Sequence, residues 1–515
     1  MTPRSPSVRR VPLAWALALV ALFALRLPHL AGPLDDPHSW RQADTVYYTW
    51  DFWRHGLDVL HPRVCWLGGH GTLIFEFALP EAIAALLDRA FGYSVLWDRL
   101  VALAFTALWA LWLHRLTRQI ADAFTARAAV ALALIAPLAQ FFSRAPQVDF
   151  AAQAFAIGML HHGLRALRGG GRGQAMAAAA CGSLAALIKG PYLIPVFPPL
   201  ALGALGAASF ADLVAVAGAV ATSAVAFVVW RAHVNAVNGA APDWFFLSGY
   251  YKEVNPWWWY VGEWRQRLSA ANWIRLFRRL ALEISSPAGL LLGAAGALLA
   301  RPAGDRAPGA RAIALAWVAG TLLYVLVFFP LNVIHDYYQI PLVAPVALLS
   351  ALGLRALTRE GRLPAVRALA WLAFAGALAL SLVAPRHQGY YRIDALRESA
   401  ARAIDARVPE ADLLLVVDHD SGYSDPRLLG RALRHGWALK AEEVTPAMVE
   451  RLHALGARWL AWVSEPGVAR LAPPAFLAGR EVGGEALLDA SHAGRGQPPL
   501  VLGTLHLYRL GDAPR

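Results

Sequence analysis

Long apolar stretches separated by short polar or basic segments occupy roughly the first 385 of the 515 residues. A helix needs about 20 mostly apolar residues to cross a bilayer. Eleven stretches approach this length, near residues 11–29, 97–117, 127–143, 149–166, 173–188, 191–207, 212–230, 285–300, 312–330, 339–354 and 368–384. The pattern predicts an all-α polytopic membrane module over residues 1–385, with about eleven transmembrane helices.

Two segments between these stretches mix apolar and charged positions. Residues 74–91 are apolar but carry three carboxylates and Arg89, and residues 257–284 place five arginines among Trp and Leu. Both predict amphipathic helices that lie at the membrane surface instead of crossing it. They fall within a first outer loop (30–96) and a long outer loop (231–284).

The pattern changes after residue 385. Three short apolar runs predict buried strands, at 413–420, 458–465 and 501–510. Two amphipathic stretches predict helices, at 391–407 and 445–456. Residues 386–515 are therefore expected to form a small α/β domain outside the membrane.

Composition agrees with a membrane protein and excludes other classes. The chain is 57% hydrophobic and only 16% charged, against about 25% charged residues in soluble domains. The same figures exclude a disordered chain, and two cysteines are too few for a disulfide framework.

The net charge of +12 comes almost entirely from arginine. If the amino end is cytoplasmic, every second loop should be basic. The loops with arginines at 115 and 118, at 165, 168 and 172, at 301, 306 and 311, and at 355, 359, 362 and 367 fit this rule. We therefore expect a multi-pass protein of the cell (inner) membrane, with a cytoplasmic N-terminus and a periplasmic or extracellular C-terminal domain. Basic residues interleaved with aromatic ones also suit single-stranded nucleic acid, but on the outer face we expect no nucleic-acid partner.

Polar groups gather on the predicted outer face. Directly after the first span, ten residues hold Asp35, Asp36, His38, Arg41 and Asp44, followed by several aromatic residues. Amphipathic rings favour the headgroup level of the membrane. A solvated loop with local salt bridges is the alternative interpretation.

Three later segments bring further charged groups to the same face. They are SRAPQVDF with Arg144 and Asp149, ALIKGPY with Lys189, and NVIHDYYQIPLVAP with His335 and Tyr338. Ionisable groups at membrane depth are costly unless they are paired or face a cavity. The alternatives are an Arg144–Asp149 pair at helix ends, a snorkelling lysine and an aromatic belt. One shared polar cavity accounts for all four segments together.

These motifs, in this order, resemble the GT-C superfamily of integral membrane glycosyltransferases. The resemblance rests on the acidic first loop, FEFALPEAIAALLDRAFG (75–92) followed by Arg99, SRAPQVD, ALIKGPYLIP and HDYYQIPLVAP. The resemblance is nearest to the polyprenyl-phosphate-sugar branch, which includes protein O-mannosyltransferases and the lipid A aminoarabinose transferase. It implies an inverting transferase that moves a sugar from a polyprenyl-phosphate donor to a hydroxyl of a glycolipid, glycan or protein.

The resemblance also implies roles for the polar residues. Asp36 would be the general base, and Asp149 a second carboxylate that orients the acceptor or the base. The donor phosphate and sugar would be bound by Arg41, Lys189, His335 and Tyr338. Asp35, His38 and Arg144 would line the acceptor side.

The first loop departs from the family pattern. The family usually has an Asp-Glu pair there, whereas this chain has Asp35–Asp36. Counting back from Gly56, the family pair would fall on Arg41–Gln42. Asp36 is therefore the first candidate for the base, Asp44 the second and Asp35 the third.

A transporter of a lipid-linked or anionic substrate is the main alternative, since intramembrane charges also mark transport pathways. A non-catalytic membrane subunit is another. The chain has no internal repeat and its polar groups gather at one face, which favours the transferase. Asp and His are present, but no ligand spacing compels a metal site, so no metal ligands are assigned and a need for a divalent metal stays open. The sugar, the acceptor and the oligomeric state stay open as well.

Overall fold

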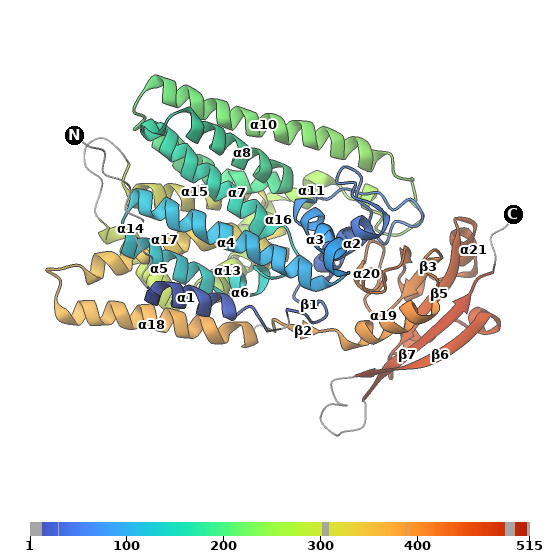
Figure 1. The fold of residues 1–515 in the computed structure, drawn as a ribbon. Helices are drawn as coiled ribbons and strands as arrows, with labels where there is room; N and C mark the ends of the chain where they lie inside the picture. The colour runs from blue at the N-terminus through green and yellow to red at the C-terminus, as the bar shows by residue number, and fades with distance from the viewer. Residues whose placement is uncertain (1–12, 29, 301–307, 388, 490–499, 512–515) are drawn as a thin grey trace.

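The computed structural model describes residues 13–28, 30–300, 308–387, 389–489 and 500–511. Long helices form one bundle, and an α/β part lies at one end of it (Figure 1). The arginines at positions 301 and 306, used to predict the orientation, lie outside the described residues, as does the amino end over residues 1–12.

Each predicted apolar stretch coincides with helical structure. The bundle contains α1 (Leu13–Ala24), α4 (Val95–Ile120), α5 (Ala123–Ile135), α6 (Pro137–Phe142), α7 (Asp149–Arg165), α8 (Arg172–Lys189), α9 (Phe197–Ala204), α10 (Phe210–Gly239), α14 (Pro287–Leu299), α15 (Ala310–Val327), α17 (Ile340–Thr358) and α18 (Pro364–His387). The prediction of a helical membrane module with a small C-terminal sheet is confirmed.

The count of eleven spans is not confirmed. Within the described residues, six helices are long and apolar enough to cross a membrane, or seven if the bent pair Ala270–Ile284 and Pro287–Leu299 counts as one span. Part of the difference arises because α1, α5 and α7 have only 12, 13 and 17 residues, fewer than a crossing normally needs. Another difference is that residues 172–204 form one helical stretch by length.

That stretch nevertheless reverses direction at Lys189, whose backbone leaves the helical region. A Cβ on Gly163 would touch Leu200, and a Cβ on Gly203 would touch Leu164. Residues 190–204 therefore run back along α7, as the predicted turn at Lys189 requires. The turn places Lys189 at the same end of the bundle as the start of α7.

The first outer loop contains β1 (Asp35–Asp36), α2 (Ser39–His55) and α3 (Leu79–Phe91). The predicted amphipathic segment at 74–91 is confirmed as a helix from residue 79. In Figure 1, α2 and α3 lie between the long helices and the C-terminal sheet.

The long outer loop differs from its prediction in two ways. It begins later, because α10 continues to Gly239. The single amphipathic helix predicted for 257–284 is wrong: the segment forms α11 (Pro256–Tyr260), α12 (Trp264–Leu268), α13 (Ala270–Arg279) and the π-helical turn η4 (Leu280–Ile284). Gly262 has a φ of 74° and Ser269 is extended, so the backbone leaves the helix at both places.

The C-terminal part is a five-stranded sheet in the order β4-β3-β5-β7-β6. Its strands are β3 (Leu413–Val417), β4 (Gly436–Ala438), β5 (Ala457–Ser464), β6 (Glu481–Asp489) and β7 (Leu500–Arg509), and its helices are α19 (Ala395–Arg407), α20 (Arg427–Arg431) and α21 (Pro446–Ala454). The three predicted strands and two predicted helices are confirmed. Strands β4 and β6 were missed because β4 has three residues and β6 is a polar, Gly-containing edge strand.

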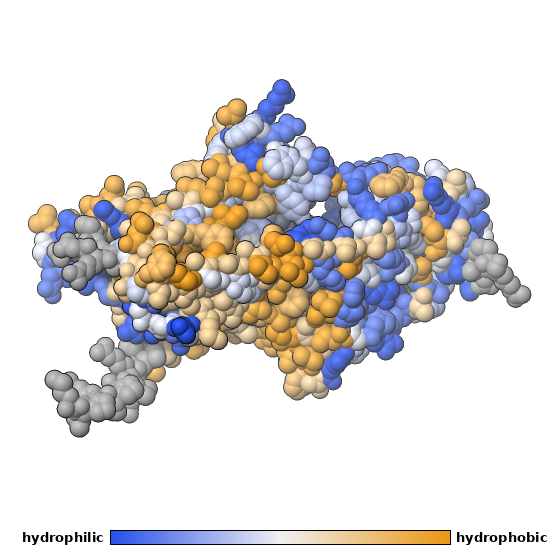
Figure 2. All heavy atoms as spheres, turned by 90° about the horizontal axis from the view of Figure 1, so that it is seen from above, coloured by the Kyte–Doolittle hydropathy of each residue, from blue (hydrophilic) through white to orange (hydrophobic). Residues whose placement is uncertain are grey.

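The first outer loop and the C-terminal part share one hydrophobic core. Tyr47, Trp50 and Trp66 of the loop belong to the same cluster of buried residues as Trp437 and Leu396. The backbone joins too, because the Gly436 N–H donates to the Cys65 carbonyl at 2.8 Å. The C-terminal part is therefore anchored on the segment that carries α2. Figure 2 shows the corresponding surface, largely apolar over the helical part and largely hydrophilic over the C-terminal part.

Candidate active site

Asp36 lies where the first loop meets the strand that leads into the C-terminal part. Strand β1 pairs antiparallel with β2 (Arg392–Ile393), and the Tyr391 N–H donates to the Asp36 carbonyl at 2.9 Å. The Asp36 carboxylate accepts one hydrogen bond, from the Ser39 N–H at 3.1 Å, and it remains partly exposed. The segment fixes the backbone of Asp36 and leaves its side chain accessible.

Asp35 has the opposite environment. Its side chain is fully buried and forms an ion pair with Arg144, while Arg99 Nη2 lies 3.7 Å from its other oxygen. Arg144 also covers the Tyr391 ring at 4.8 Å. The pair predicted as an alternative, Arg144 with Asp149, does not form. Asp35 and Arg144 instead support the backbone around Asp36.

Two more first-loop residues point in different directions from α2. Arg41 forms a partly buried ion pair with Glu76 and lies over the Phe75 ring at 4.8 Å. Asp44 is buried and accepts a hydrogen bond from Trp66 Nε1 at 3.0 Å. Burial raises the pKa of Asp44 to about 7, although the charge of Arg41 acts against it. Asp44 therefore belongs to the packing between loop and C-terminal part.

Asp149 and Lys189 form a buried pair at the end of the long helices. Lys189 Nζ lies 2.8 Å from Asp149 Oδ1, and the Tyr192 hydroxyl donates to the same oxygen. The ammonium also lies over the rings of Tyr192 at 5.0 Å, Tyr337 at 5.2 Å and Tyr338 at 4.5 Å. Aromatic faces attract a cation without neutralising it.

His38 and His335 extend this cluster. His38 Nε2 lies 2.9 Å from Asp336 Oδ1, and its ring centroid is 5.2 Å from that of His335. Burial, together with the charges of His38 and Lys189, lowers the pKa of His335 to about 3. The buried Nδ1 of this neutral imidazole has no hydrogen-bond partner within the described part of the chain.

These groups converge on one place. The ring of Tyr337 lies 4.9 Å from that of His38, 5.3 Å from that of His335 and 5.1 Å from that of Tyr338, and the Lys189 ammonium lies 5.2 Å from it. Arg41, Asp149, Glu76 and Asp336 lie within electrostatic range of it. Six predicted site residues thus lie together around Tyr337: Arg41, Asp149, Lys189, His335, Tyr338 and His38. Asp35 and Arg144 adjoin them through β1, and Asp44 faces Trp66. The described residues contain no group of three or more His, Cys, Asp or Glu side chains suited to a metal ion.

Four residues of this cluster are not among the predicted site residues: Glu76, Tyr192, Tyr337 and Asp336. Glu76 falls inside the stretch that reads as an interfacial helix, so its carboxylate was attributed to a polar helix face. The other three stand within the motifs around Lys189 and His335. Their adjacency to those residues was a usable signal, but their contacts depend on tertiary packing.

Comparison with known proteins gives the fold. No protein-family model and no curated protein sequence matches this chain. Among solved structures, ArnT from Cupriavidus metallidurans bound to undecaprenyl phosphate superposes with a TM-score of 0.60 at 16% identity, covering 96% of this chain and 98% of that one.

Two other membrane enzymes are similar. AglB, the oligosaccharyltransferase of Archaeoglobus fulgidus, was solved with an inhibitory peptide and a dolichol-phosphate; its TM-score is 0.55 at 12% identity, over 87% of this chain and 69% of that one. The arabinofuranosyltransferase AftD from Mycobacteria has a TM-score of 0.59 at 14% identity, over 100% of this chain and 41% of that one. The chain therefore shares its fold with ArnT, AglB and AftD, and the resemblance seen in the sequence is confirmed at the level of the fold.

Proposed function

We propose that this chain transfers a sugar from a polyprenyl-phosphate donor to a hydroxyl group of a glycolipid, glycan or protein, with inversion at the anomeric carbon. The single observation that carries the proposal is Lys189, a buried cation surrounded by three tyrosines and one carboxylate at the end of an apolar helix bundle. A phosphate attached to a lipid tail needs such a counter-charge at headgroup depth. GT-C neighbours solved with undecaprenyl phosphate and dolichol-phosphate support the same donor class.

In the proposed reaction, Asp36 accepts the proton of the acceptor hydroxyl as that oxygen attacks the anomeric carbon. The bond between that carbon and the bridging phosphate oxygen breaks, and its electron pair leaves with the polyprenyl phosphate. Lys189 and Arg41 stabilise the charge that develops on the phosphate. A single displacement of this kind inverts the anomeric centre. The partial exposure of Asp36, compared with the buried Asp35 and Asp44, supports it as the base.

The proposal includes an arrangement in the membrane. Residues 1–385 would form the transferase module, and residues 386–515 a domain on the outer, periplasmic or extracellular face of the cell membrane. The N-terminus would be cytoplasmic. The shared core between the first outer loop and the C-terminal part supports one common side for both.

The test is native mass spectrometry of the detergent-purified protein beside its Asp36→Asn form, each loaded with polyprenyl-phosphate sugars. We expect both forms to bind the lipid. Only the wild-type protein should lose the sugar when an acceptor is added, because general-base catalysis contributes about 10²–10⁴-fold. An Asp44→Asn variant is the matched control and should keep its turnover. Equal turnover by wild type and Asp36→Asn would refute Asp36 as the base. Absence of polyprenyl lipid in every form would favour a transporter.

A further inference from the structure

A cavity at the far end of the helix bundle has no part in the proposed reaction. Helix α17 starts beside Tyr338 and runs for 19 residues, about 28 Å at 1.5 Å per residue. Its last turns, with the end of α14 and the start of α15, enclose a cavity of about 520 Å³. Leu352 and Arg359, which line the cavity, lie 12 and 19 residues after Ile340, so the cavity lies about 18–28 Å along the helix from its start beside Tyr338.

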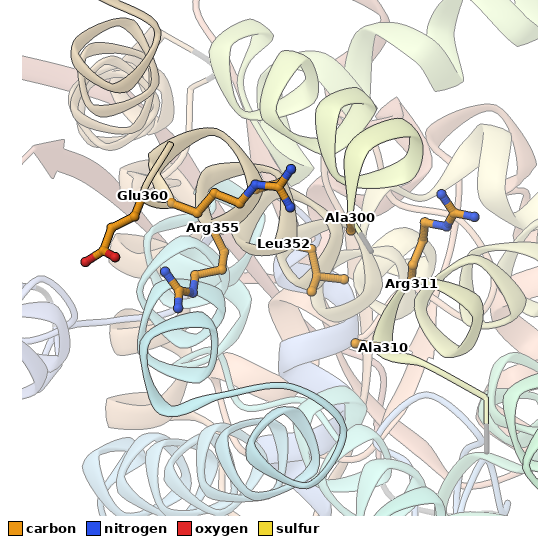
Figure 3. A pocket seen from close by; sticks show the side chains of 8 residues that line it. Ala300, Ala310, Arg311, Leu352, Arg355 and Glu360 are labelled. Carbon is orange, nitrogen blue, oxygen red and sulfur yellow. The ribbon is translucent and has the colours of Figure 1, made fainter. Parts of the chain in front are cut away.

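The lining of this cavity combines an apolar floor with a cationic rim. Leu352, Ala356, Ala300 and Ala310 supply the floor, and the rim is formed by Arg311, Arg355, Arg359 and Glu360. Figure 3 shows Arg311 and Arg355 on opposite sides of Leu352, with the Glu360 side chain pointing away from Arg311. Positive charge therefore dominates the mouth.

The three arginines are not equally engaged. Arg355 Nε donates to Asp122 Oδ2 at 2.8 Å and its guanidinium lies over the Phe124 ring at 5.8 Å. Arg311 donates a long hydrogen bond of 3.4 Å to the Leu298 carbonyl. Within the part of the chain that the structure describes, neither Arg311 nor Arg359 has a carboxylate partner. Two guanidiniums at the cavity thus keep their capacity to bind an anion.

We propose that this cavity binds the phosphate of an anionic lipid headgroup, in the leaflet opposite the candidate active site. Guanidinium groups match phosphate oxygens with paired hydrogen bonds. The apolar floor suits the first methylene groups of the lipid, and the volume lies within the range of small-ligand sites. Basic pockets between transmembrane helices at the cytoplasmic leaflet recognise anionic headgroups in this way. In this proposal the bound lipid bridges the start of α15 and the end of α17.

The test compares three forms of the full-length protein in nanodiscs and by native mass spectrometry. They are the wild type, Arg311→Gln/Arg359→Gln, and the control Arg118→Gln/Arg367→Gln, which removes two exposed arginines from loops predicted to lie on the same face. The probes are phosphatidylglycerol, phosphatidylcholine and inorganic phosphate. We expect the wild type and the control to retain phosphatidylglycerol in preference to phosphatidylcholine. The Arg311→Gln/Arg359→Gln form should bind it at least about tenfold more weakly, because hydrogen bonds to charged groups are lost.

Three results would overturn the proposal. One is retention of phosphatidylglycerol by the Arg311→Gln/Arg359→Gln form at the level of the control. Another is equal retention of phosphatidylcholine by the wild type. The third is a rise in the melting temperature of the wild type that is as large with inorganic phosphate as with phosphatidylglycerol. That result would assign the cavity to a free anion. Binding of a polyprenyl donor at Lys189 is measured separately, so the outcome does not depend on the transferase proposal.

Discussion

Two buried clusters of opposite charges, one in the C-terminal part and one at the end of the helices, differ in how completely their polar atoms are matched. In the first, Arg397 forms two hydrogen bonds to Asp418, at 2.7 and 2.8 Å, and a third to Asp394 at 2.7 Å. Burial would raise the pKa of Asp418, but the hydrogen bonds and charge of Arg397 outweigh burial and lower it. Each of the three guanidinium nitrogens of Arg397 thus donates to a carboxylate, and in this sense the cluster is saturated.

The polar atoms of the second cluster, around Lys189, are matched less completely. Lys189 has three N–H donors and one carboxylate partner, Asp149, while its other neighbours are aromatic faces. His335 nearby keeps an unmatched ring nitrogen within the described chain. Buried polar groups are normally satisfied, and exceptions gather at functional sites. The ion pair of Arg397 therefore stabilises the C-terminal part, whereas the environment of Lys189 suits the donor site proposed above.

The largest expected effect removes the saturated cluster. Arg397→Gln leaves Asp418 buried without its cation, which should cost about 3–5 kcal/mol and lower the melting temperature of the C-terminal part by about 10 °C or more. Thermal proteolysis of the purified protein measures this. The control is Arg54→Ala, which breaks an exposed pair with Glu410 and should cost less than about 1 kcal/mol. Similar losses of stability in the two variants would show that the buried pair of Arg397 adds no more stability than an exposed ion pair.

A smaller effect is expected in the unsaturated cluster, and it should fall on binding. Lys189→Gln should weaken binding of undecaprenyl phosphate by about 10–100-fold, because a charge-assisted contact is lost. Titration by native mass spectrometry measures the affinity. Lys252→Gln, which breaks an ion pair with Asp243 in the long outer loop, is the control and should bind normally. Unchanged binding by Lys189→Gln would remove the lysine from the proposed donor site.

The smallest effect concerns Asp44, between the two regions. Burial raises its pKa to about 7, with Asp425 and Glu76 adding to the shift and Arg41 and Trp66 opposing it. The folded protein therefore keeps a proton that the unfolded chain releases near its usual pKa, so stability falls as pH rises from about 4 to about 7. Between pH 6 and 8 the loss should be about 1 kcal/mol.

The asparagine of Asp44→Asn does not titrate, so the melting temperature of this variant should fall less between pH 6 and 8 than that of the wild type. Differential scanning fluorimetry at both pH values gives the difference, in which other titrating groups cancel. Equal changes in melting temperature for the two proteins would place the ionisation of Asp44 outside this pH range. That result would return Asp44 to consideration as an accessible carboxylate.

Much of the candidate site could be predicted because its residues stand at the ends of apolar stretches. Arg41, Asp149, Lys189, His335 and Tyr338 were all expected at one end of the bundle, and the structure brings them together. The predicted helix at 257–284 failed because local backbone breaks at Gly262 and Ser269 interrupt an otherwise amphipathic pattern. The span count is not confirmed, because apolar length along the sequence does not show where a helix ends, as in α1 and α5.

The partner of each buried charged residue could not be predicted from the sequence. Arg144 was near Asp149 in the chain, yet it pairs with Asp35, 109 residues away, and Asp149 pairs with Lys189. The sequence ranked three acidic residues of the first loop as candidates for the base, and burial now separates them into an ion-paired Asp35, a packed Asp44 and an accessible Asp36. Neighbouring side chains from distant segments set these environments.

The sequence by itself determined the helical membrane module, the small C-terminal sheet and the end of the bundle at which charged groups gather. Those features follow from apolar length and from the cost of burying charge in a bilayer, and both are properties of local sequence. Tertiary structure decided which charges neutralise one another, because each pair joins segments far apart in the chain. It also decided that Lys189 lies among tyrosines with Asp149 as its carboxylate partner and that Arg311 and Arg359 meet at a cavity towards the other end of the bundle.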